Sequence, residues 1–229
     1  RLTFERLNRF IPTENIYILT NSSYEQLVLD QLPELTASQV LCEPERKNTA
    51  PCIAYAAAKI HALDPNATLL ISPADHLIIN EKRFEEIIDV AWQTAQDGQL
   101  VTLGIEPSRP DTGYGYIEFA KTETAVKGSA CPVLQFREKP DLATAQSFLE
   151  AGTFYWNAGI FVWKSGVILA ALEAHQNDIL ILNNQTVTHH QELNDGVEVE
   201  TNGFTFKTNK LIFTTNGFAS QLTHNLVQP

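Results

Sequence analysis

Asp75 is the residue of this chain best placed to do chemistry. It follows the apolar run Ala67-Thr-Leu-Leu-Ile-Ser-Pro and precedes His76. Apolar side chains on both faces are typical of a central strand in a parallel sheet, covered by helices above and below. In open α/β sheets, ligands bind beyond the carboxyl ends of such strands. Asp75 is therefore a candidate Mg²⁺ ligand for a phosphate-bearing substrate, or alternatively the cap of a helix predicted over residues 81–96.

Alternating strand-like and helix-like patterns must position this aspartate. Repeated β-α-β units of this kind predict a parallel sheet with right-handed crossovers. The expected strands cover residues 15–20, 39–43, 67–72 and 100–104, and the expected helices cover residues 22–31, 52–63 and 81–96.

The pattern changes after residue 104. Residues 115–119 and 133–138 predict a pair of strands, followed by a helix over 141–151 with an Asp cap, a strand over 159–163 and a helix over 165–175. We therefore expect an α/β, Rossmann-like fold with a mostly parallel sheet flanked by helices and an inserted hairpin.

The C-terminal part has a different texture. Short alternating strands are expected at residues 197–201, 204–207 and 210–215, separated by the turn signals Asn202-Gly203 and Thr208-Asn209. This pattern predicts a β-meander that does not continue the α/β repeat.

Composition limits the classes of partner. The 229 residues carry a net charge of −11, which argues against nucleic acid or an anionic membrane as the main partner. No apolar stretch is long enough for a membrane span, and no signal peptide is recognised. The three cysteines are odd in number and lack C-x-x-C spacing, which favours reduced thiols in a cytoplasmic protein.

Five motifs occur in a specific order. They are Glu43-Pro-Glu-Arg-Lys-Asn-Thr-Ala-Pro, Pro73-Ala-Asp-His, Asp111-Thr-Gly-Tyr-Gly-Tyr-Ile-Glu, Phe136-Arg-Glu-Lys-Pro and Trp156-Asn-Ala-Gly-Ile-Phe. Each motif alone is weak. Together, over about the first 180 residues, they resemble the sugar nucleotidyltransferases, specifically the bacterial mannose-1-phosphate guanylyltransferases. The resemblance implies a fold of the nucleotide-diphospho-sugar transferase type.

This resemblance also implies a reaction. GTP and mannose 1-phosphate would yield GDP-mannose and pyrophosphate, with Mg²⁺ neutralising charge on the phosphates. Positioning and electrostatics dominate such a step, because little covalent work falls to the protein.

On the nucleotide side, the resemblance makes Asp75 the metal-binding and catalytic aspartate. It also makes Asn48 and Thr49 nucleotide contacts. Loop amides and a helix N-terminus offer donors to such a ligand. The alternative is that Asn48 only caps the following helix.

On the sugar side, the resemblance assigns Gly115, Glu138, Lys139 and Asn157 to the sugar phosphate. A glycine at 115 would let the backbone approach the sugar. Glu138 would accept bonds from sugar hydroxyls, Lys139 would hold the phosphate as a second catalytic residue, and Asn157 would contact a hydroxyl. Alternatively, Glu138 and Lys139 are an exposed charge pair. Trp156 is expected to pack, and Arg109 to be a surface or supporting charge.

Two features depart from this family. No G-G-x-G-x-R stretch, the family's triphosphate-gripping loop, occurs in the 229 residues. We therefore expect residues 1–182 to be a truncated nucleotidyltransferase domain that is nearly inactive, because losing one such donor costs about 10²–10³ in rate.

The second departure is the tail. Residues 183–229 resemble a piece of a FAD-dependent amine or D-amino-acid oxidoreductase, which suggests a foreign fragment. No flavin binding is inferred, because the G-x-G-x-x-G fingerprint is absent. A non-catalytic sugar-phosphate and nucleotide-binding module and an oxidoreductase fragment are the alternative functions. Homo-oligomerisation is left open.

Overall fold

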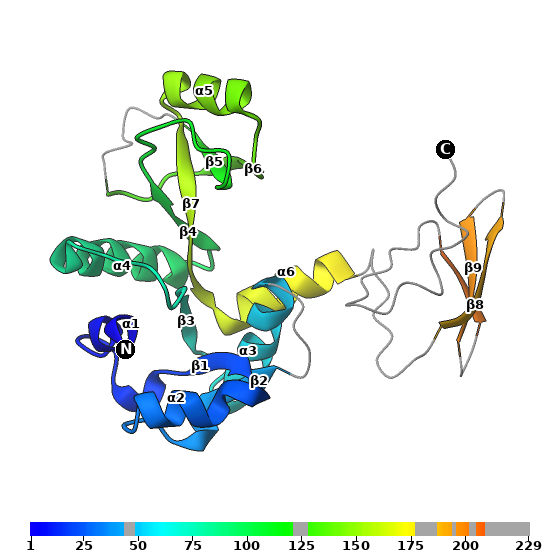
Figure 1. Ribbon diagram of the computed structural model, residues 1–229, viewed down its shortest axis with the longest axis horizontal. Coiled ribbons are helices and arrows are strands. Elements are labelled where there is room, and N and C mark those ends of the chain that lie inside the picture. The colour runs from blue at the N-terminus through cyan, green and yellow to red at the C-terminus, as the bar shows by residue number, and fades with distance from the viewer. Residues whose placement is uncertain (44–48, 121–127, 177–186, 194–195, 202–204, 209–229) are drawn as a thin grey trace. The chain divides into compact units, whose positions relative to one another are not determined.

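The structure is a computed structural model, shown in Figure 1. It describes residues 1–43, 49–120, 128–176, 187–193, 196–201 and 205–208, with side chains described up to residue 174. The chain divides into two compact units, Arg1–Asn177 and Asp178–Pro229, which are described separately.

The first unit alternates helices and strands, as its sequence predicts. The described helices are α1 (Leu2–Leu7), α2 (Glu25–Gln31), α3 (Thr49–Leu63), α4 (Glu81–Gln96), α5 (Leu142–Ala151) and α6 (Ser165–Gln176). The described strands are β1 (Ile18–Asn21), β2 (Val40–Glu43), β3 (Thr68–Ile71), β4 (Val101–Ile105), β5 (Tyr116–Phe119), β6 (Val133–Arg137) and β7 (Phe154–Lys164).

Strand β7 organises the central sheet, and Figure 1 shows it running through the middle of the unit. Val162 pairs with both Leu70 of β3 and Val101 of β4, so these two strands lie on opposite edges of β7. Trp156 likewise pairs with β4 and with β5. Strands β3 and β5 therefore share one edge of β7, and β4 occupies the other.

The α/β class is confirmed, but the strand directions differ from the expected mostly parallel sheet. Strands β1 and β2 do pair in parallel. In the central sheet, β3, β4 and β5 each pair antiparallel to β7, and β6 pairs antiparallel to β5. Strands β3 and β4 still run in the same direction as each other. Because β7 lies between them and opposes both, the described pairs of this sheet are antiparallel.

Both faces of β3 are covered, as its apolar run predicts. Leu70 packs in the clusters that α4 contributes to, beside Ile160 and Val162 of β7. Leu69 and Ile71 point the other way, into the cluster formed by α3 and α6. The strand that carries Asp75 at its end is therefore held between two helical layers.

The inserted hairpin is also confirmed. Strands β5 and β6 pair antiparallel, and α5 covers one face of β5 by burying Ala145 against Tyr116, Phe154 and Trp156. Asp141 caps α5 as expected, because its side chain accepts a hydrogen bond from the Thr144 amide.

Several elements begin elsewhere than predicted. Strand β1 begins at Ile18 and not at residue 15, and α3 begins at Thr49 and not at residue 52. The segment expected to be helical from residue 22 opens with a 3₁₀ turn, Ser22–Tyr24, and its cap is Asn21. Strand β7 begins at Phe154, before the expected residue 159, and its even-numbered residues from 154 to 162 are buried. Burial alternates regularly from residue 154 to residue 162, so residues 154–158 belong to the same continuous strand as the predicted part.

The second unit contains a three-stranded antiparallel sheet in the order β10–β9–β8. Its strands are β8 (Val187–Leu193), β9 (Gly196–Thr201) and β10 (Thr205–Thr208). This confirms the meander, although β8 was not predicted. Residues 202–204 and 209–229, which include the Asn202-Gly203 turn and the strand expected over 210–215, lie outside the described residues.

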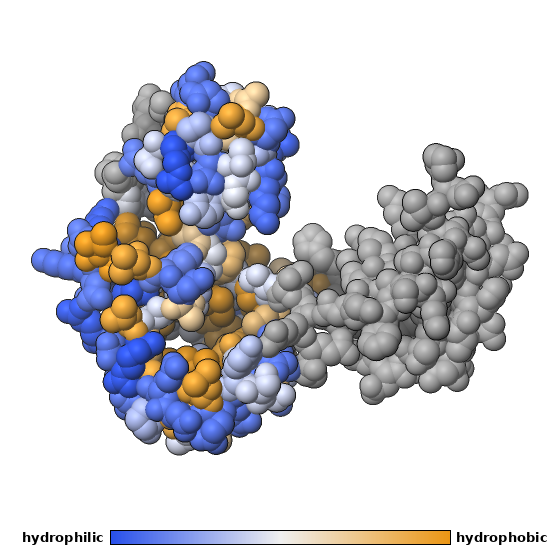
Figure 2. Space-filling model, viewed as in Figure 1, coloured by the Kyte–Doolittle hydropathy of each residue, from blue (hydrophilic) through white to orange (hydrophobic). Residues whose placement is uncertain are grey.

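Figure 2 shows hydrophilic residues over much of one face, with smaller groups of hydrophobic residues between them. Among the described residues, none of the helices combines the length and the apolar character that crossing a bilayer requires.

Candidate functional site

The candidate site lies along β7, on the edge that β3 and β5 share. Strand β3 pairs with residues 161–164 of β7, and β5 pairs with residues 154–156. The residues of β7 between these two pairs adjoin the loop that follows β3 and the loop that precedes β5. The motif that begins at Pro73 and the motif that begins at Asp111 therefore both lie beside the motif in β7 that begins at Trp156.

A bulge in β7 shapes this meeting point. Three residues of β7, 158–160, stand opposite a single residue of β4. Gly159 adopts a positive φ of 65°, which a glycine tolerates at such a bulge. The Asn157 side-chain oxygen accepts a 2.9 Å hydrogen bond from the Gly159 amide. A Cβ built on Gly159 would lie 3.4 Å from Cγ of Pro73, so the loop after β3 packs against the bulge.

The sugar-side residues converge from three strands. The Asn157 amide donates a 2.8 Å hydrogen bond to the Gly115 carbonyl. Tyr116 pairs with Arg137, which places Gly115 beside Glu138. A Cβ built on Gly115 would lie 2.8 Å from Oε2 of Glu138. A side chain at 115 would therefore displace the Glu138 carboxylate from this position beside the backbone. The sequence predicts that the backbone at Gly115 lies close to a sugar. In the structure, the group close to this backbone is the Glu138 carboxylate.

Lys139 follows this carboxylate and has an unusual backbone. Its φ is 37°, the only positive φ of a non-glycine residue in the described part of the chain. Such conformations cost about 1–3 kcal/mol and persist where the surroundings impose them. Glu138 and Lys139 are both exposed, and neither side chain has a hydrogen bond or ion pair with another described residue. Among the described residues, nothing pairs with either charged group, so both are available to a ligand.

Asp75 lies in the loop that packs on the bulge. Its side chain is exposed and makes no hydrogen bond or ion pair with the described residues. The capping alternative is wrong for Asp75, because Asn80 caps α4 by accepting a hydrogen bond from the Arg83 amide.

The surroundings of Asp75 suit one type of metal site. The described residues contain no cluster of three or more His, Cys, Asp or Glu side chains that could hold a metal ion. Mg²⁺ does not need such a cage, because it often binds through one or two carboxylates together with substrate phosphates. An exposed carboxylate whose oxygens accept no hydrogen bond from a described residue fits this mode of binding.

Of the two predicted nucleotide contacts, the structure describes only Thr49. Thr49 is the first residue of α3 and is exposed, as a nucleotide contact requires. No described hydrogen bond or ion pair joins it to the residues around the bulge. Asn48 lies outside the described residues.

A supporting cluster behind the site was largely missed from the sequence. The Asp111 carboxylate accepts hydrogen bonds from the Gly113 amide and from Arg109. The Asp111 backbone amide and carbonyl both bond the Tyr116 hydroxyl. The Gly113 amide, and to a lesser extent Arg109, hold the pKa of Asp111 below its ordinary value. An Asp two residues before a glycine is a known turn signal that could have identified this role.

Arg109 and Trp156 behave as the sequence indicates. The Arg109 guanidinium lies 5.2 Å from the centroid of the Trp156 ring, and the Tyr114 ring lies 5.1 Å from it. Trp156 is buried, so it packs under the glycine-containing loop. The Asp111–Gly115 loop is therefore held by contacts within the protein.

Comparison with known proteins agrees with this geometry. The sequence profile of the nucleotidyl transferase family matches residues 2–200. The chain therefore belongs to the nucleotidyl transferase family.

Individual relatives make the class more specific. The chain is 41% identical over 160 residues to the mannose-1-phosphate guanylyltransferase of Salmonella montevideo, covering 68% of this chain and 33% of that protein. The crystal structure described as mannose-1-phosphate geranyltransferase from Thermus thermophilus superposes with a TM-score of 0.68 at 27% identity. That superposition covers 77% of this chain and 50% of that one. The sugar nucleotidyltransferase resemblance is confirmed.

A further relative bears on the tail. The alginate biosynthesis protein AlgA of Pseudomonas syringae pv. tomato is 33% identical over 208 residues, covering 90% of this chain and 41% of that protein. An alignment of that length extends beyond residue 182, as the family profile does. The resemblance of residues 183–229 to an oxidoreductase stays a prediction. The chain spans between about a third and two fifths of the length of the two curated relatives described here.

Proposed function

We propose that the protein is a mannose-1-phosphate guanylyltransferase, to which this chain contributes the sugar-phosphate subsite and a metal-binding aspartate. The observation that carries this proposal is the convergence of Gly115, Glu138 and Asn157 on the β7 bulge, with the Asp75 loop packed on the same bulge. The names of the relatives supply the sugar and the base.

On the sugar side, each residue has a task that its surroundings permit. The exposed Glu138 carboxylate accepts hydrogen bonds from hydroxyls of the mannose. The Asn157 side-chain oxygen is occupied by the Gly159 amide, so its NH₂ group is the part that donates to the sugar. The Lys139 ammonium holds the sugar phosphate and counters its negative charge.

On the nucleotide side, Asp75 holds Mg²⁺ together with phosphate oxygens, and Asn48 and Thr49 contact the nucleotide. When bound, Mg²⁺ supplies positive charge that stabilises the phosphates in the transition state. An oxygen of the sugar phosphate forms a bond to the α-phosphorus of GTP, and the bond from that phosphorus to the pyrophosphate oxygen breaks. The products are GDP-mannose and pyrophosphate. Residues of this chain act by positioning the two substrates.

A second candidate function is a binding module without turnover. It is favoured by the exposed carboxylate of Glu138 and ammonium of Lys139, which suit a sugar phosphate whether or not turnover follows. In this case the sugar-phosphate subsite would operate without catalysis.

The three cysteines support a cytoplasmic location for either function. Cys42, Cys52 and Cys131 are free thiols. Burial, the largest cause, raises the pKa of Cys52 to about 11, which keeps its thiol protonated and unreactive near neutral pH. Partly buried, reduced thiols of this kind are typical of a reducing compartment.

Calorimetry separates the candidates. The chain is titrated with mannose 1-phosphate, with GTP in the presence and absence of Mg²⁺, and with FAD, and pyrophosphate release is measured in parallel. Pyrophosphate release that requires Mg²⁺ supports the transferase. Sugar-phosphate binding without turnover supports the module. Binding of FAD alone would contradict both.

A further inference from the structure

Helix α1 reaches the loop that carries Asp75. The Thr3 hydroxyl donates a 2.8 Å hydrogen bond to the Ala74 carbonyl. A terminal nitrogen of Arg6 lies 3.4 Å from the His76 carbonyl, to which it donates, and 3.2 Å from the Thr3 hydroxyl. The two carbonyls belong to the residues on either side of Asp75. Side chains of α1 thus hold the backbone on both sides of the aspartate.

Arg6 is an unusual residue for this position. Its side chain is buried, with 3% of the residue exposed, and its guanidinium lies 5.6 Å from the centroid of the Phe84 ring. Its Nε has no hydrogen-bond partner, and no ion pair to a carboxylate is found among the described residues. Burying a guanidinium without a carboxylate costs free energy. The fold tolerates this cost where the donors of Arg6 reach the Asp75 loop.

Helix α1 is itself firmly held. Phe4 is buried in one hydrophobic cluster, and Leu7 packs in another that includes Ile78, just after the Asp75 loop. Arg9 forms ion pairs with Glu81 and Glu85 at the start of α4.

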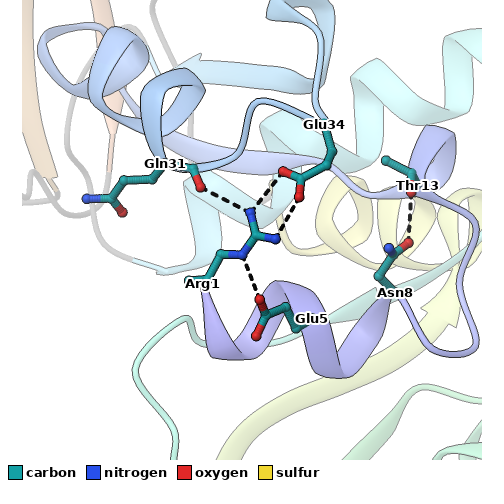
Figure 3. A network of polar contacts seen from close by, with 6 residues as sticks. All are labelled: Arg1, Glu5, Asn8, Thr13, Gln31 and Glu34. Atoms are coloured by element: carbon teal, nitrogen blue, oxygen red, sulfur yellow. Dashed lines mark hydrogen bonds and ion pairs between the residues drawn. The ribbon is translucent and has the colours of Figure 1, made fainter.

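Both ends of α1 have further polar contacts, which Figure 3 shows. Arg1 bonds Glu5 and, with two nitrogens, Glu34, while the Thr13 hydroxyl bonds Asn8 just after the helix. A helix fixed in this way can transmit a defined position to the loop.

We propose that Thr3 and Arg6 are positioning residues that hold Asp75 in place for metal binding. Four contacts fix the loop around Asp75: Pro73 against Gly159, the Ala74 carbonyl with Thr3, the His76 carbonyl with Arg6, and the partly buried Ile78 against a hydrophobic cluster. The Asp75 side chain makes no hydrogen bond or ion pair with another described residue. Because the backbone around Asp75 is already fixed, metal binding does not have to order the loop, and the affinity is not reduced by that entropy cost. This inference rests on the proposed role of Asp75.

The test removes one hydroxyl. Thr3→Val keeps the shape of the side chain and deletes its donor, and Thr3→Ser restores the donor. We measure the Mg²⁺ concentration that half-saturates GTP binding, and the affinity for mannose 1-phosphate without metal. Thr3→Val should raise the Mg²⁺ concentration about tenfold, as expected for a group that orients a metal ligand. Thr3→Ser should recover the unaltered value, and sugar-phosphate affinity should stay within about twofold.

Thr13→Val is the matched control. Thr13 is also partly buried, and its hydroxyl bonds Asn8 and does not reach the loop. The control should leave the Mg²⁺ requirement unchanged. Arg6→Lys, which keeps the positive charge but has a single nitrogen in place of the guanidinium, should shift the Mg²⁺ requirement in the same direction as Thr3→Val.

The outcomes distinguish the two hypotheses. If GTP binding by the unaltered chain does not depend on Mg²⁺, the metal role of Asp75 fails and the positioning role fails with it. If binding depends on Mg²⁺ but Thr3→Val behaves like Thr13→Val, the positioning role alone is wrong. Equal losses of Mg²⁺-dependent and sugar-phosphate binding in Thr3→Val would show a general structural defect and would also overturn it.

Discussion

The Asp75 loop and the sugar-side hairpin, two parts of one candidate site, are positioned in different ways. The loop around Asp75 is held by two side chains of α1, Thr3 and Arg6. Each lies 70 or more positions before the carbonyl that it binds. Gly115 and Glu138 are placed by the register of one hairpin, β5 with β6. In the first part the backbone is fixed by tertiary contacts. In the second part the pairing of neighbouring strands brings the two groups together.

This difference implies that the two parts respond separately to substitution. Changes near Asp75 should alter the metal requirement of nucleotide binding. Changes in the hairpin should alter the affinity for sugar phosphate. They meet at the β7 bulge, where Asn157 contacts both Gly159 and Gly115. Substitutions on each side therefore test whether the bulge couples them.

The largest expected effect is at Asp75. Asp75→Asn keeps the size of the side chain and removes its charge, so the Mg²⁺-dependent part of GTP affinity should fall by more than about 100-fold, the upper range for groups that only orient metal ligands. Calorimetry with and without Mg²⁺ measures this loss. Mannose 1-phosphate binding should not change. A comparable loss of sugar-phosphate affinity would mean that the two parts are not separable.

Gly115→Ala should have the next largest effect. The new Cβ would lie 2.8 Å from Oε2 of Glu138 and must displace it, which should weaken mannose 1-phosphate binding about tenfold. The Mg²⁺ requirement of GTP binding should be unaltered.

A double-mutant cycle with Glu138→Ala tests the cause of this effect. Once the carboxylate is absent, the added methyl group should cost much less affinity. Additive losses would show that Gly115 acts through another contact.

Lys139 allows charge and backbone strain to be separated. Lys139→Ala and Lys139→Gly both remove the ammonium, and both should weaken sugar-phosphate binding more than nucleotide binding. Glycine accommodates the φ of 37° without strain, so Lys139→Gly should be about 1 kcal/mol more stable to urea than Lys139→Ala. Equal stability would indicate that the backbone relaxes once the lysine is removed. Equal losses of both ligands would contradict the assigned role.

The smallest effect concerns Asp141, the cap of α5. Asp141→Ala should lower the midpoint of thermal unfolding by about 2–4 °C at neutral pH, with little change in either ligand's affinity. Hydrogen bonds from Thr144 hold the pKa of Asp141 below its ordinary value of 3.8.

The lowered pKa of Asp141 determines how its contribution to stability changes with pH. A carboxyl whose pKa is lower in the folded state stabilises the fold above the unfolded pKa, and this contribution is lost as pH falls through the folded pKa. The difference between Asp141→Ala and the unaltered chain should therefore be complete at about pH 5–7 and shrink below about pH 4. A difference that persists unchanged at about pH 3 would contradict this assignment.

Several features of the protein were determined by the sequence alone. The position of Asp75 after a strand covered on both faces follows from a continuous apolar run. The Asp141 cap and the extent of α4 follow from capping and periodicity. The five motifs predicted the family before any contact was known. These features depend on residues that are neighbours in the chain, so local patterns are sufficient to predict them.

Tertiary structure decided the rest. The insertion of β7 between β3 and β4, the bulge at Gly159 and the hydrogen bonds from Thr3 and Arg6 all join residues far apart in the chain. The positive φ of Lys139 is likewise imposed by its surroundings. A strand's sequence pattern shows which side chains are buried, but the direction of the strand and its partners depend on contacts that form only when the whole unit has folded.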